Sequence, residues 1–317
     1  NMNEGLHTLC IFVDLSKAFD SINHDILLTK MSAYGIRGRI LDWIKSYISN
    51  RPQIVEINHN GEKVRSEPTL SNRGVPQGSI IGPLLFTIYI NDLPQHLSDS
   101  KVIMYADDCT IILGKKSEEE LRASASEVMT NLSEWCSMNR LAINSNKTKF
   151  MIFKSKLSNH ISPCSGIIFK NETIEEVQES KFLGLIVDSH LNWQNHINTL
   201  CKHLSSSSFL FSKLTTYCNK NTLLSCYYSY VYSRIKFNII AWGTADQYLI
   251  DRVLILQKRI LRIIFKLKTR DSCKPLFKKH NILPVPCIII LESAMFVYKN
   301  KHLFKLNSDF HSYETRN

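Results

Sequence analysis

The sequence predicts an α+β domain followed by an all-helical region. In roughly the first 195 residues, strand-like and helix-like segments mix without the regular alternation that a doubly wound parallel sheet requires. From His196 onward, apolar residues recur at helical spacing and strand signals are few. The chain has 317 residues, 44% of them hydrophobic, which suits about two folded domains. We therefore predict one domain at 1–195, a helical region at 196–306 and a polar, frayed tail at 307–317.

Apolar patterning predicts the elements of the first domain in order. A short buried strand is expected at 9–15, followed by helix at 25–47 with breaks at Gly35 and Gly38. Alternating residues on both sides of Asn60-Gly61 predict a hairpin, because this dipeptide favours a two-residue turn. The remaining expected elements are a buried helix at 80–92, a strand at 102–113, a helix at 118–138 with Ser117 and Glu120 as its capping box, and strands at 150–153 and 182–187.

Basic residues concentrate in the second half of the chain. The net charge is +11, yet residues 1–150 carry 16 Lys and Arg against 17 Asp and Glu, so the whole excess lies in residues 151–317. Helices are expected at 223–232 and 249–265, and the latter has one apolar face and one basic face. The basic residues of that face are Arg252, Arg259, Arg262 and Lys266. We predict that they contact a polyanion; a solvated surface is the alternative.

The nine cysteines point to reduced thiols in an intracellular protein. They are odd in number and scattered, and they show neither a C-x-x-C pair nor zinc-type spacing. The longest uncharged apolar stretch, at 80–90, holds 11 residues and is too short for a transmembrane helix, so no membrane partner is expected. The composition also argues against collagen-like and disordered classes.

Three acids occur where a core strand would normally exclude them. Asp14 ends the apolar run 10–13, and Asp107 and Asp108 interrupt the apolar segment 102–113. Buried carboxylates are costly unless they are neutralised, and Mg²⁺ does this well because it prefers oxygen ligands. The pattern therefore favours a two-metal site for phosphoryl transfer. The alternative is a plain hairpin tip at 106–109, because Asp favours turns.

Five segments, in order, resemble the reverse transcriptases of non-LTR (LINE-type) retrotransposons, most closely the jockey-type elements. They are Phe12-Val-Asp-Leu-Ser-Lys-Ala-Phe-Asp20, Arg73-Gly-Val-Pro-Gln-Gly-Ser-Ile-Ile-Gly-Pro-Leu-Leu-Phe86, Tyr105-Ala-Asp-Asp108, Leu141-Ala-Ile-Asn-Ser-Asn-Lys-Thr-Lys149 and Phe182-Leu-Gly-Leu185. The resemblance implies a polymerase palm, an antiparallel sheet backed by helices, followed by a basic helical thumb. It also implies RNA-directed DNA synthesis, with RNA template, DNA primer and dNTPs as partners.

The resemblance assigns roles to particular residues. Asp14, Asp107 and, less directly, Asp108 would hold two Mg²⁺ ions, with Mn²⁺ as a substitute and the Leu15 carbonyl as a further ligand. Lys147 would protonate or neutralise pyrophosphate. Its alternative is an exposed turn lysine.

Further roles concern the nucleotide and the primer. Phe19 would exclude a ribose 2′-hydroxyl, with an ordinary core Phe as the alternative. Gln77 and Gly78 would contact the incoming nucleotide and template, with a plain turn as the alternative. The segment Phe182, Leu183 and Gly184 would grip the primer terminus.

The resemblance also sets expectations beyond this chain. Most of a fingers subdomain and an endonuclease are expected upstream, and the protein is expected in nucleus and cytoplasm as a ribonucleoprotein. Two rival interpretations remain: a relic that binds nucleic acid without polymerising, and a metal-dependent nuclease that uses the same acids. An intron-encoded or telomere-type polymerase is an alternative closer to the main interpretation, but the residues that make up the motifs disfavour it.

Overall fold

The computed structural model describes residues 6–59, 61–153, 167–169 and 172–304, and the chain divides into two compact units, Asn1–Ser180 and Lys181–Asn317. The division lies before residue 195 because β12 (Leu185–Asp188) packs against α6 (Gln194–Tyr217) in the second unit. The expected tail at 307–317, Asn60 of the expected hairpin turn, and Cys164 lie outside the described residues.

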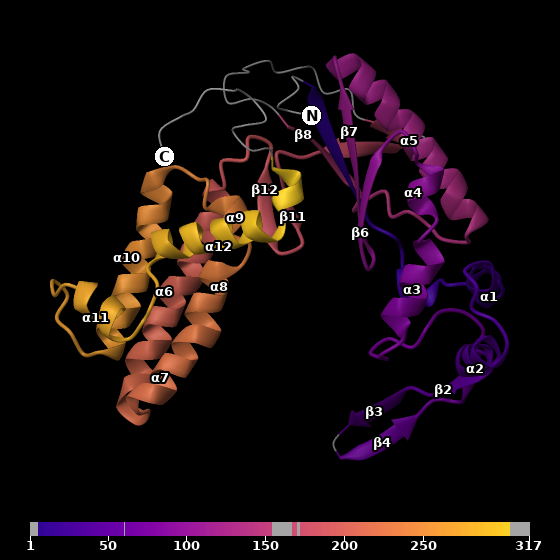
Figure 1. Cartoon of the computed structure of the whole chain (residues 1–317). Coiled ribbons are helices and arrows are strands. Elements are labelled where there is room, and N and C mark those ends of the chain that lie inside the picture. The colour runs from indigo at the N-terminus through magenta and orange to yellow at the C-terminus, as the bar shows by residue number, and fades with distance from the viewer. Residues whose placement is uncertain (1–5, 60, 154–166, 170–171, 305–317) are drawn as a thin grey trace. The chain divides into compact units, whose positions relative to one another are not determined.

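A mixed, mainly antiparallel sheet forms the centre of the first unit (Figure 1). Within the described residues its strand order is β6 (Lys101–Tyr105), β7 (Asp108–Lys115), β1 (His7–Val13), β8 (Lys149–Phe153), β10 (Glu172–Glu176) and β9 (Ile167–Phe169). Neighbouring strands run antiparallel except for β8 and β10, which are parallel. The strands predicted at 9–15 and 150–153 are therefore confirmed as β1 and β8.

Helix α5 (Glu118–Met138) covers the sheet and closes its core. It packs against β7, β1 and β9, and its buried face includes Leu121 and Met129. The helix begins where it was predicted, because Ser117 Oγ accepts a hydrogen bond from the Glu120 backbone N–H at 3.2 Å. Strand β1 is enclosed by β7 and β8, which explains its nearly complete burial.

Shorter helices follow β1 and lead to the loop at Gln77. The expected breaks at Gly35 and Gly38 separate α1 (His24–Ala33) from α2 (Arg39–Ile48). The buried helix expected at 80–92 is α3 (Gly82–Ile90), and α4 (Leu93–His96) follows it. The expected hairpin consists of β3 (Glu56–His59) and β4 (Glu62–Arg65). An additional pair, β2 (Arg51–Gln53) with β5 (Thr69–Ser71), was not predicted.

Two segments predicted as single strands are hairpins instead. The prediction of one strand at 102–113 is wrong, because Ala106, at φ 52°, and Asp107 reverse the chain between β6 and β7. The prediction of one strand at 182–187 is also wrong. Leu183 and Gly184, both with positive φ, turn the chain between β11 (Glu179–Phe182) and β12. In both cases a two-residue turn interrupts a mostly apolar segment that the sequence pattern indicated as one strand.

The second unit is helical beyond its first hairpin. Its long helices α6 and α10 (Gln247–Ile264) pack together, and α12 (Val285–Lys299) packs against α10 and α9 (Ile239–Trp242). The helix predicted at 249–265 is α10, and the one predicted at 223–232 combines α7 with a π-helical turn. The other elements are α7 (Lys220–Tyr227), the π-helix Tyr228–Tyr232, α8 (Ser233–Lys236), α11 (Lys274–Lys279) and a short 3₁₀ helix at Lys301–Leu303.

Neither a disulfide nor a membrane-crossing helix is present in the described part of the chain. None of the eight cysteines it contains forms a disulfide, and five of them are buried. None of its helices combines the length and the apolar character that a membrane crossing requires.

Candidate active site

The strand register brings Asp14 and Asp108 to adjacent positions at one end of the sheet. Val13, the last residue of β1, pairs with Cys109 of β7. One step further along this antiparallel ladder, Asp14 follows Val13 and Asp108 precedes Cys109. Asp107 belongs to the turn of the β6–β7 hairpin, directly before Asp108. The three carboxylates therefore lie at the same end of the strands of the sheet.

These acids are not buried inside a core strand, which corrects the argument made from the sequence. Asp107 and Asp108 are exposed and Asp14 is half-buried. The hairpin turn carries the acidic pair beyond the core, so the geometry of the hairpin alternative is right. Convergence on Asp14 then follows from the strand pairing and requires no burial.

Electrostatic repulsion within this cluster acts on Asp108. Partial burial raises the pKa of the Asp108 carboxyl, and the negative charges of Asp107 and Asp14 raise it further. Each of these causes disfavours the ionised form of Asp108. A cation bound among the three acids would reverse the charge repulsion, so the cluster has the electrostatics of a cation site.

The chemistry of the donors fits Mg²⁺ or Mn²⁺ because carboxylates are hard oxygen ligands. Among the described residues, however, no group of three or more His, Cys, Asp or Glu side chains is arranged so that it could hold a metal ion. Repelling carboxylates tend to turn apart, and exposed Asp side chains can rotate at little cost. A cation shared by Asp14, Asp107 and Asp108 would require these side chains to turn toward a common centre.

The variant Asp108→Asn is expected to increase the stability of the first unit in the absence of divalent ions. The folded-state pKa of Asp108 is raised, so its ionisation destabilises the fold as pH rises through that pKa, and this penalty is absent in acid. We expect a gain of a few tenths to about 1 kcal/mol at pH 7, because the group is largely exposed and its interactions are screened. Urea unfolding of both proteins at pH 3 and pH 7 measures the difference. A variant that is less stable at pH 7 than wild type would contradict this reading of the cluster.

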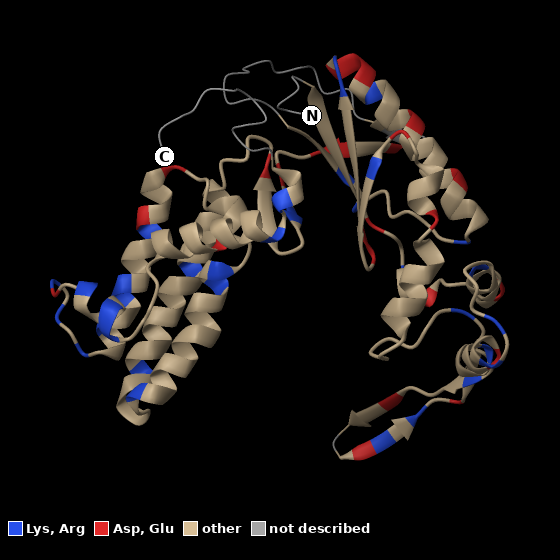
Figure 2. Cartoon of the chain, viewed as in Figure 1, with Lys and Arg blue, Asp and Glu red and all other residues tan. Residues whose placement is uncertain are grey.

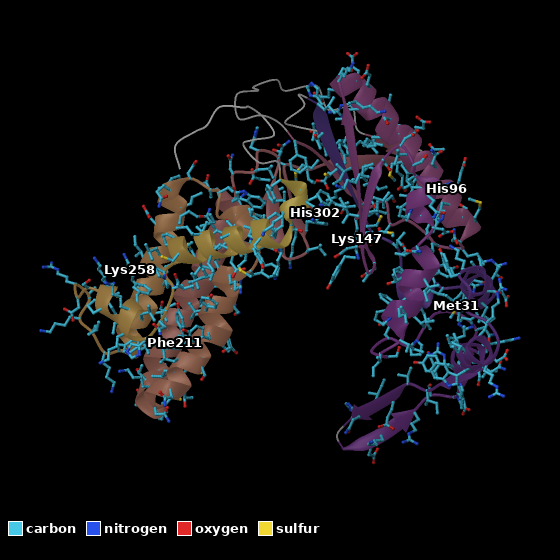
Figure 3. The ribbon with its side chains drawn as sticks, in the orientation of Figure 1. Met31, His96, Lys147, Phe211, Lys258 and His302 are labelled. Atoms are coloured by element: carbon cyan, nitrogen blue, oxygen red, sulfur yellow. The ribbon has the colours of Figure 1, made fainter. Side chains whose placement is uncertain are left out.

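A second segment is fastened beside Asp14. The Asn144 N–H donates to the Asp14 carbonyl oxygen at 2.8 Å, and Leu15 pairs with Ile143 in an isolated bridge. The following strand β8 begins at Lys149, opposite Phe12 of β1. Exposed Lys147 therefore belongs to the end of the sheet that carries the acids (Figure 3). The Leu15 backbone lies next to the acidic cluster through its position in the chain.

Phe19 packs against the hydrophobic core of the first unit. Its ring stacks on Phe86 with the ring centroids 4.7 Å apart and an interplanar angle of 29°. The side chain is half-buried against the core and its other part remains accessible. A packed ring with one accessible side is compatible with both a core role and contact with a ligand.

Gln77 is held by a residue that the sequence analysis did not select. Gln77 Nε2 donates a hydrogen bond to Asp20 Oδ1 at 3.1 Å. The loop that carries Gln77 is fastened to the Asp20 segment, because the Val75 N–H donates to the Phe19 carbonyl at 2.9 Å and the Gly74 N–H donates to the Ile22 carbonyl at 2.8 Å. The orientation of the Gln77 amide thus depends on Asp20.

Gly74 and Gly78 serve the same loop in different ways. Gly74 has φ +73°, and a Cβ there would lie 2.7 Å from the Asp20 Cα, so only glycine allows this close approach. Gly78 has φ +79° and open space around the site of a Cβ, so it is required for the turn alone. Gln77 and Gly78 are both exposed, which leaves this part of the loop free for contact.

A polar cavity of about 570 Å³ opens beside Gln77. It is lined by Asp20, Arg51, Gln53, Ser71, Asn72, Arg73, Val75, Pro76 and Gln77. The sequence analysis missed Asp20, Arg51 and Arg73 as site residues. Asp20 and Arg73 lie at the ends of two recognised segments, which was an available signal, whereas Arg51 reaches the cavity through the unpredicted β2–β5 pair.

The site residues predicted for the second unit lie in two places, the β11–β12 turn and α10 with the residues that follow it. Phe182, Leu183 and Gly184 lie at the β11–β12 turn, where Phe237 ring atoms lie 3.2 Å from the position of a Gly184 Cβ. The predicted basic residues do not form one free face. Arg252 donates to Asn198 Oδ1 at 2.9 Å, Arg262 donates to the Asp271 carbonyl at 2.9 Å, Arg259 is exposed, and Lys266 lies beyond the end of α10 with φ 53°.

Comparison with known proteins gives a family match over the whole of the first unit and the first residues of the second. Residues 1–187 match the family described as "Reverse transcriptase (RNA-dependent DNA polymerase)". The chain is 27% identical over 271 residues to a probable RNA-directed DNA polymerase from transposon BS of Drosophila melanogaster, covering 80% of this chain and 28% of that protein. It is 26% identical over 274 residues to an RNA-directed DNA polymerase from mobile element jockey of Drosophila funebris, covering 82% of this chain and 29% of that protein.

The chain thus spans less than a third of the length of these relatives. A solved structure of apo telomerase from Candida tropicalis matches with a TM-score of 0.41 and 12% identity, covering 86% of this chain and 43% of that chain.

Proposed function

The chain belongs to the reverse transcriptase (RNA-dependent DNA polymerase) family, and from this premise we propose that its first unit carries the polymerising centre of an enzyme that copies RNA into DNA. The observation that carries the proposal is the strand register that sets Asp14 beside Asp108, with Asp107 in the adjoining turn. In this proposal the first unit is the palm and the helical second unit contains the thumb. RNA template, DNA primer and dNTPs are the proposed partners.

Asp14 and Asp107, assisted by Asp108, are the proposed ligands of two Mg²⁺ ions. When bound, these ions would lower the pKa of the primer 3′-hydroxyl and neutralise charge on the triphosphate and the departing pyrophosphate. The 3′-oxygen attacks the α-phosphorus, and the bond to pyrophosphate breaks. The pKa of Asp108 is raised first by partial burial and then by the negative charges of Asp107 and Asp14, and cations bound here would offset that charge repulsion, which supports this assignment.

The side chains around the cluster position the reactants. Lys147 Nζ is the proposed proton donor to pyrophosphate, and the Leu15 carbonyl is a further oxygen donor beside Asp14. The accessible side of Phe19 would meet the sugar of the incoming nucleotide and disfavour a 2′-hydroxyl. Gln77 and Gly78 would contact the nucleotide and template. Arg51 and Arg73 line the cavity beside Gln77 and supply positive charge that phosphates prefer.

The proposed roles in the second unit are contacts with nucleic acid. Phe182, the last residue of β11, and the two turn residues Leu183 and Gly184 are proposed to contact the primer terminus. Exposed Arg259 and Lys266 are proposed to contact phosphates. Arg252 and Arg262 each use one N–H donor within the unit, toward Asn198 and Asp271, and keep their other donors. Phosphate contacts of this kind make binding strongly dependent on salt.

Primer extension tests the proposed function. The assay uses the complete open reading frame that encodes this chain, an RNA template annealed to a DNA primer, all four dNTPs and Mg²⁺. Extension that depends on dNTPs, template and Mg²⁺ is the expected result. Binding of the template without extension would favour the relic interpretation, and Mg²⁺-dependent strand cleavage without dNTPs would favour the nuclease.

Asp20→Ala is expected to raise KM for the incoming nucleotide about 3- to 10-fold, since the Gln77 amide loses its hydrogen-bond acceptor, worth about 1 kcal/mol. Asp20→Asn retains an Oδ1 acceptor and is expected to restore most of the affinity. Steady-state primer extension over a range of dNTP concentrations measures both variants. Equal effects of Ala and Asn would contradict a role for Asp20 in positioning Gln77 through this hydrogen bond.

A further inference from the structure

The second unit contains a cavity of about 640 Å³ that none of the proposed polymerase roles uses. It lies where α10, α11 and the start of α12 meet, and Figure 3 labels one of its residues, Lys258, on α10. Its wall is largely apolar and includes the ring of Phe277 together with Ile282. A volume of this size is typical of a small-molecule or nucleotide site, which is usually about 300–1,000 Å³.

Four basic side chains surround this apolar wall. Lys258 and Arg262 lie one turn apart on α10, and Lys274 and Lys278 lie one turn apart on α11. The cavity has no acidic lining residue. Figure 2 shows Lys and Arg gathered on α11 and on α10. Within the described residues, none of the four forms an ion pair, so their charge is available to a ligand.

One of these cations is fixed in direction. Arg262 Nε donates to the Asp271 carbonyl oxygen at 2.9 Å, while Asp271 Oδ2 accepts from the Lys268 N–H at 2.8 Å. Asp271 Oδ2 is therefore engaged by backbone, and among the described residues no ion pair joins the Asp271 carboxylate to Arg262. The Arg262 guanidinium keeps its other N–H donors for an anion at the cavity.

The lining of the cavity indicates which class of ligand fits it, because it combines an apolar wall, an aromatic ring and several basic side chains. A fatty acid or similar amphiphile presents one anionic head, which brings a single negative charge to four basic side chains. A nucleic-acid strand has one negative charge per nucleotide, so it can meet several of them. Its unpaired bases can also stack on an aromatic side chain, whereas bases in a duplex are already stacked on each other.

We propose that this cavity binds an unpaired nucleotide of single-stranded nucleic acid, with the base against Phe277 and the neighbouring phosphates on the basic side chains of α10 and α11. The site is separate from the carboxylate cluster of the first unit. It does not require the polymerisation reaction, so it can be tested on protein in which that reaction is disabled.

Binding affinity for defined oligonucleotides tests the basic rim. Lys274→Gln with Lys278→Gln removes two exposed charges, and Lys202→Gln with Lys213→Gln on α6 removes the same charge away from the cavity. With a fluorescent 12-nucleotide single strand, the cavity variant is expected to show a salt dependence of affinity shallower by about 1.4, or about 0.7 per lost phosphate contact. The α6 variant is expected to retain the wild-type slope. Equal slopes for the two variants would overturn the proposal.

The probe itself tests the base pocket. An oligonucleotide with abasic sites keeps the phosphates but lacks bases, and it is expected to bind about 5- to 150-fold more weakly. RNA and DNA of one sequence are compared to identify the preferred sugar. Equal affinity for the intact and abasic strands, or for single strand and duplex, would show that only charge is recognised and would overturn the base pocket.

The reactivity of Cys287 can show whether a ligand occupies the cavity, because this thiol is exposed and lines the cavity. A saturating single strand is expected to slow its alkylation by iodoacetamide, measured by peptide mass spectrometry. Half-buried Cys218, outside the cavity, serves as the internal control and should be unaffected. Unchanged alkylation of Cys287, or protection by decanoate but not by the oligonucleotide, would overturn the assignment. Performing the experiment with Asp107→Asn protein distinguishes loss of this site from loss of polymerase activity.

Discussion

Asp107→Asn is expected to lower nucleotide incorporation by about 10³-fold or more, because it removes a carboxylate from the proposed site of the divalent ions. The fold should survive, since Asp107 is an exposed turn residue and Asn suits turns equally well. Single-turnover primer extension under saturating dNTP measures the loss. Circular dichroism and the midpoint of thermal unfolding report whether the fold is retained.

The matched control is Asp99→Asn, which removes the same charge from an exposed position in the first unit, away from the acidic cluster. It should polymerise like wild type. If Asp107→Asn incorporated nucleotides at the wild-type rate while folded, the proposed role of the acidic turn in catalysis would be wrong. Equal losses in both variants would point to net charge as the cause.

Gly74→Ala is expected to lower the free energy of unfolding by about 2–5 kcal/mol, the sum of a left-handed backbone penalty and overpacking. At φ +73°, its Cβ would lie 2.7 Å from the Asp20 Cα and 2.9 Å from the Phe19 carbonyl oxygen. Both contacts are with backbone, which cannot rotate away. Because the clash separates the Gln77 loop from Asp20, incorporation should fall as well. Urea unfolding and primer extension measure the two effects.

Gly35→Ala separates the two causes of that loss. Gly35 has φ +87°, and a Cβ there meets nothing within 4 Å, so only the backbone penalty of about 1–2 kcal/mol is expected, with normal activity. A Gly74→Ala protein as stable and active as Gly35→Ala would contradict the close approach between the loop and the Asp20 segment.

The sequence predicted most elements of the first unit because their signals are local. The strand at β1, the breaks at Gly35 and Gly38, and the Ser117 cap of α5 depend on a few neighbouring residues each. Family membership was also recognisable from short ordered segments, which the match over residues 1–187 confirms. The turn at Leu183–Gly184 was missed, and the turn at Ala106–Asp107 was only an alternative to a continuous strand, because apolar residues continue on both sides of each turn.

The site was harder to predict where it depends on distant pairing. The hydrogen bond from Gln77 to Asp20 joins residues 57 positions apart, so the sequence alone assigned Asp20 no role in the site. The argument that these acids are buried in a core strand was wrong, because they lie beyond the core, and it is the pairing of β1 with β7 that brings Asp14 next to Asp108. Helical periodicity predicted that Arg252, Arg259 and Arg262 share one basic face. In the structure, Arg252 donates to Asn198 and Arg262 donates to Asp271.

Anomalous X-ray scattering from Mn²⁺ tests the central claim most directly. Crystals of the protein with primer–template and a non-hydrolysable dNTP would be grown with Mn²⁺ in place of Mg²⁺. The account predicts Mn²⁺ peaks within coordinating distance, about 2.0–2.3 Å, of carboxylate oxygens of both Asp14 and Asp107. A bound primer and nucleotide with no Mn²⁺ peak at these carboxylates would contradict it.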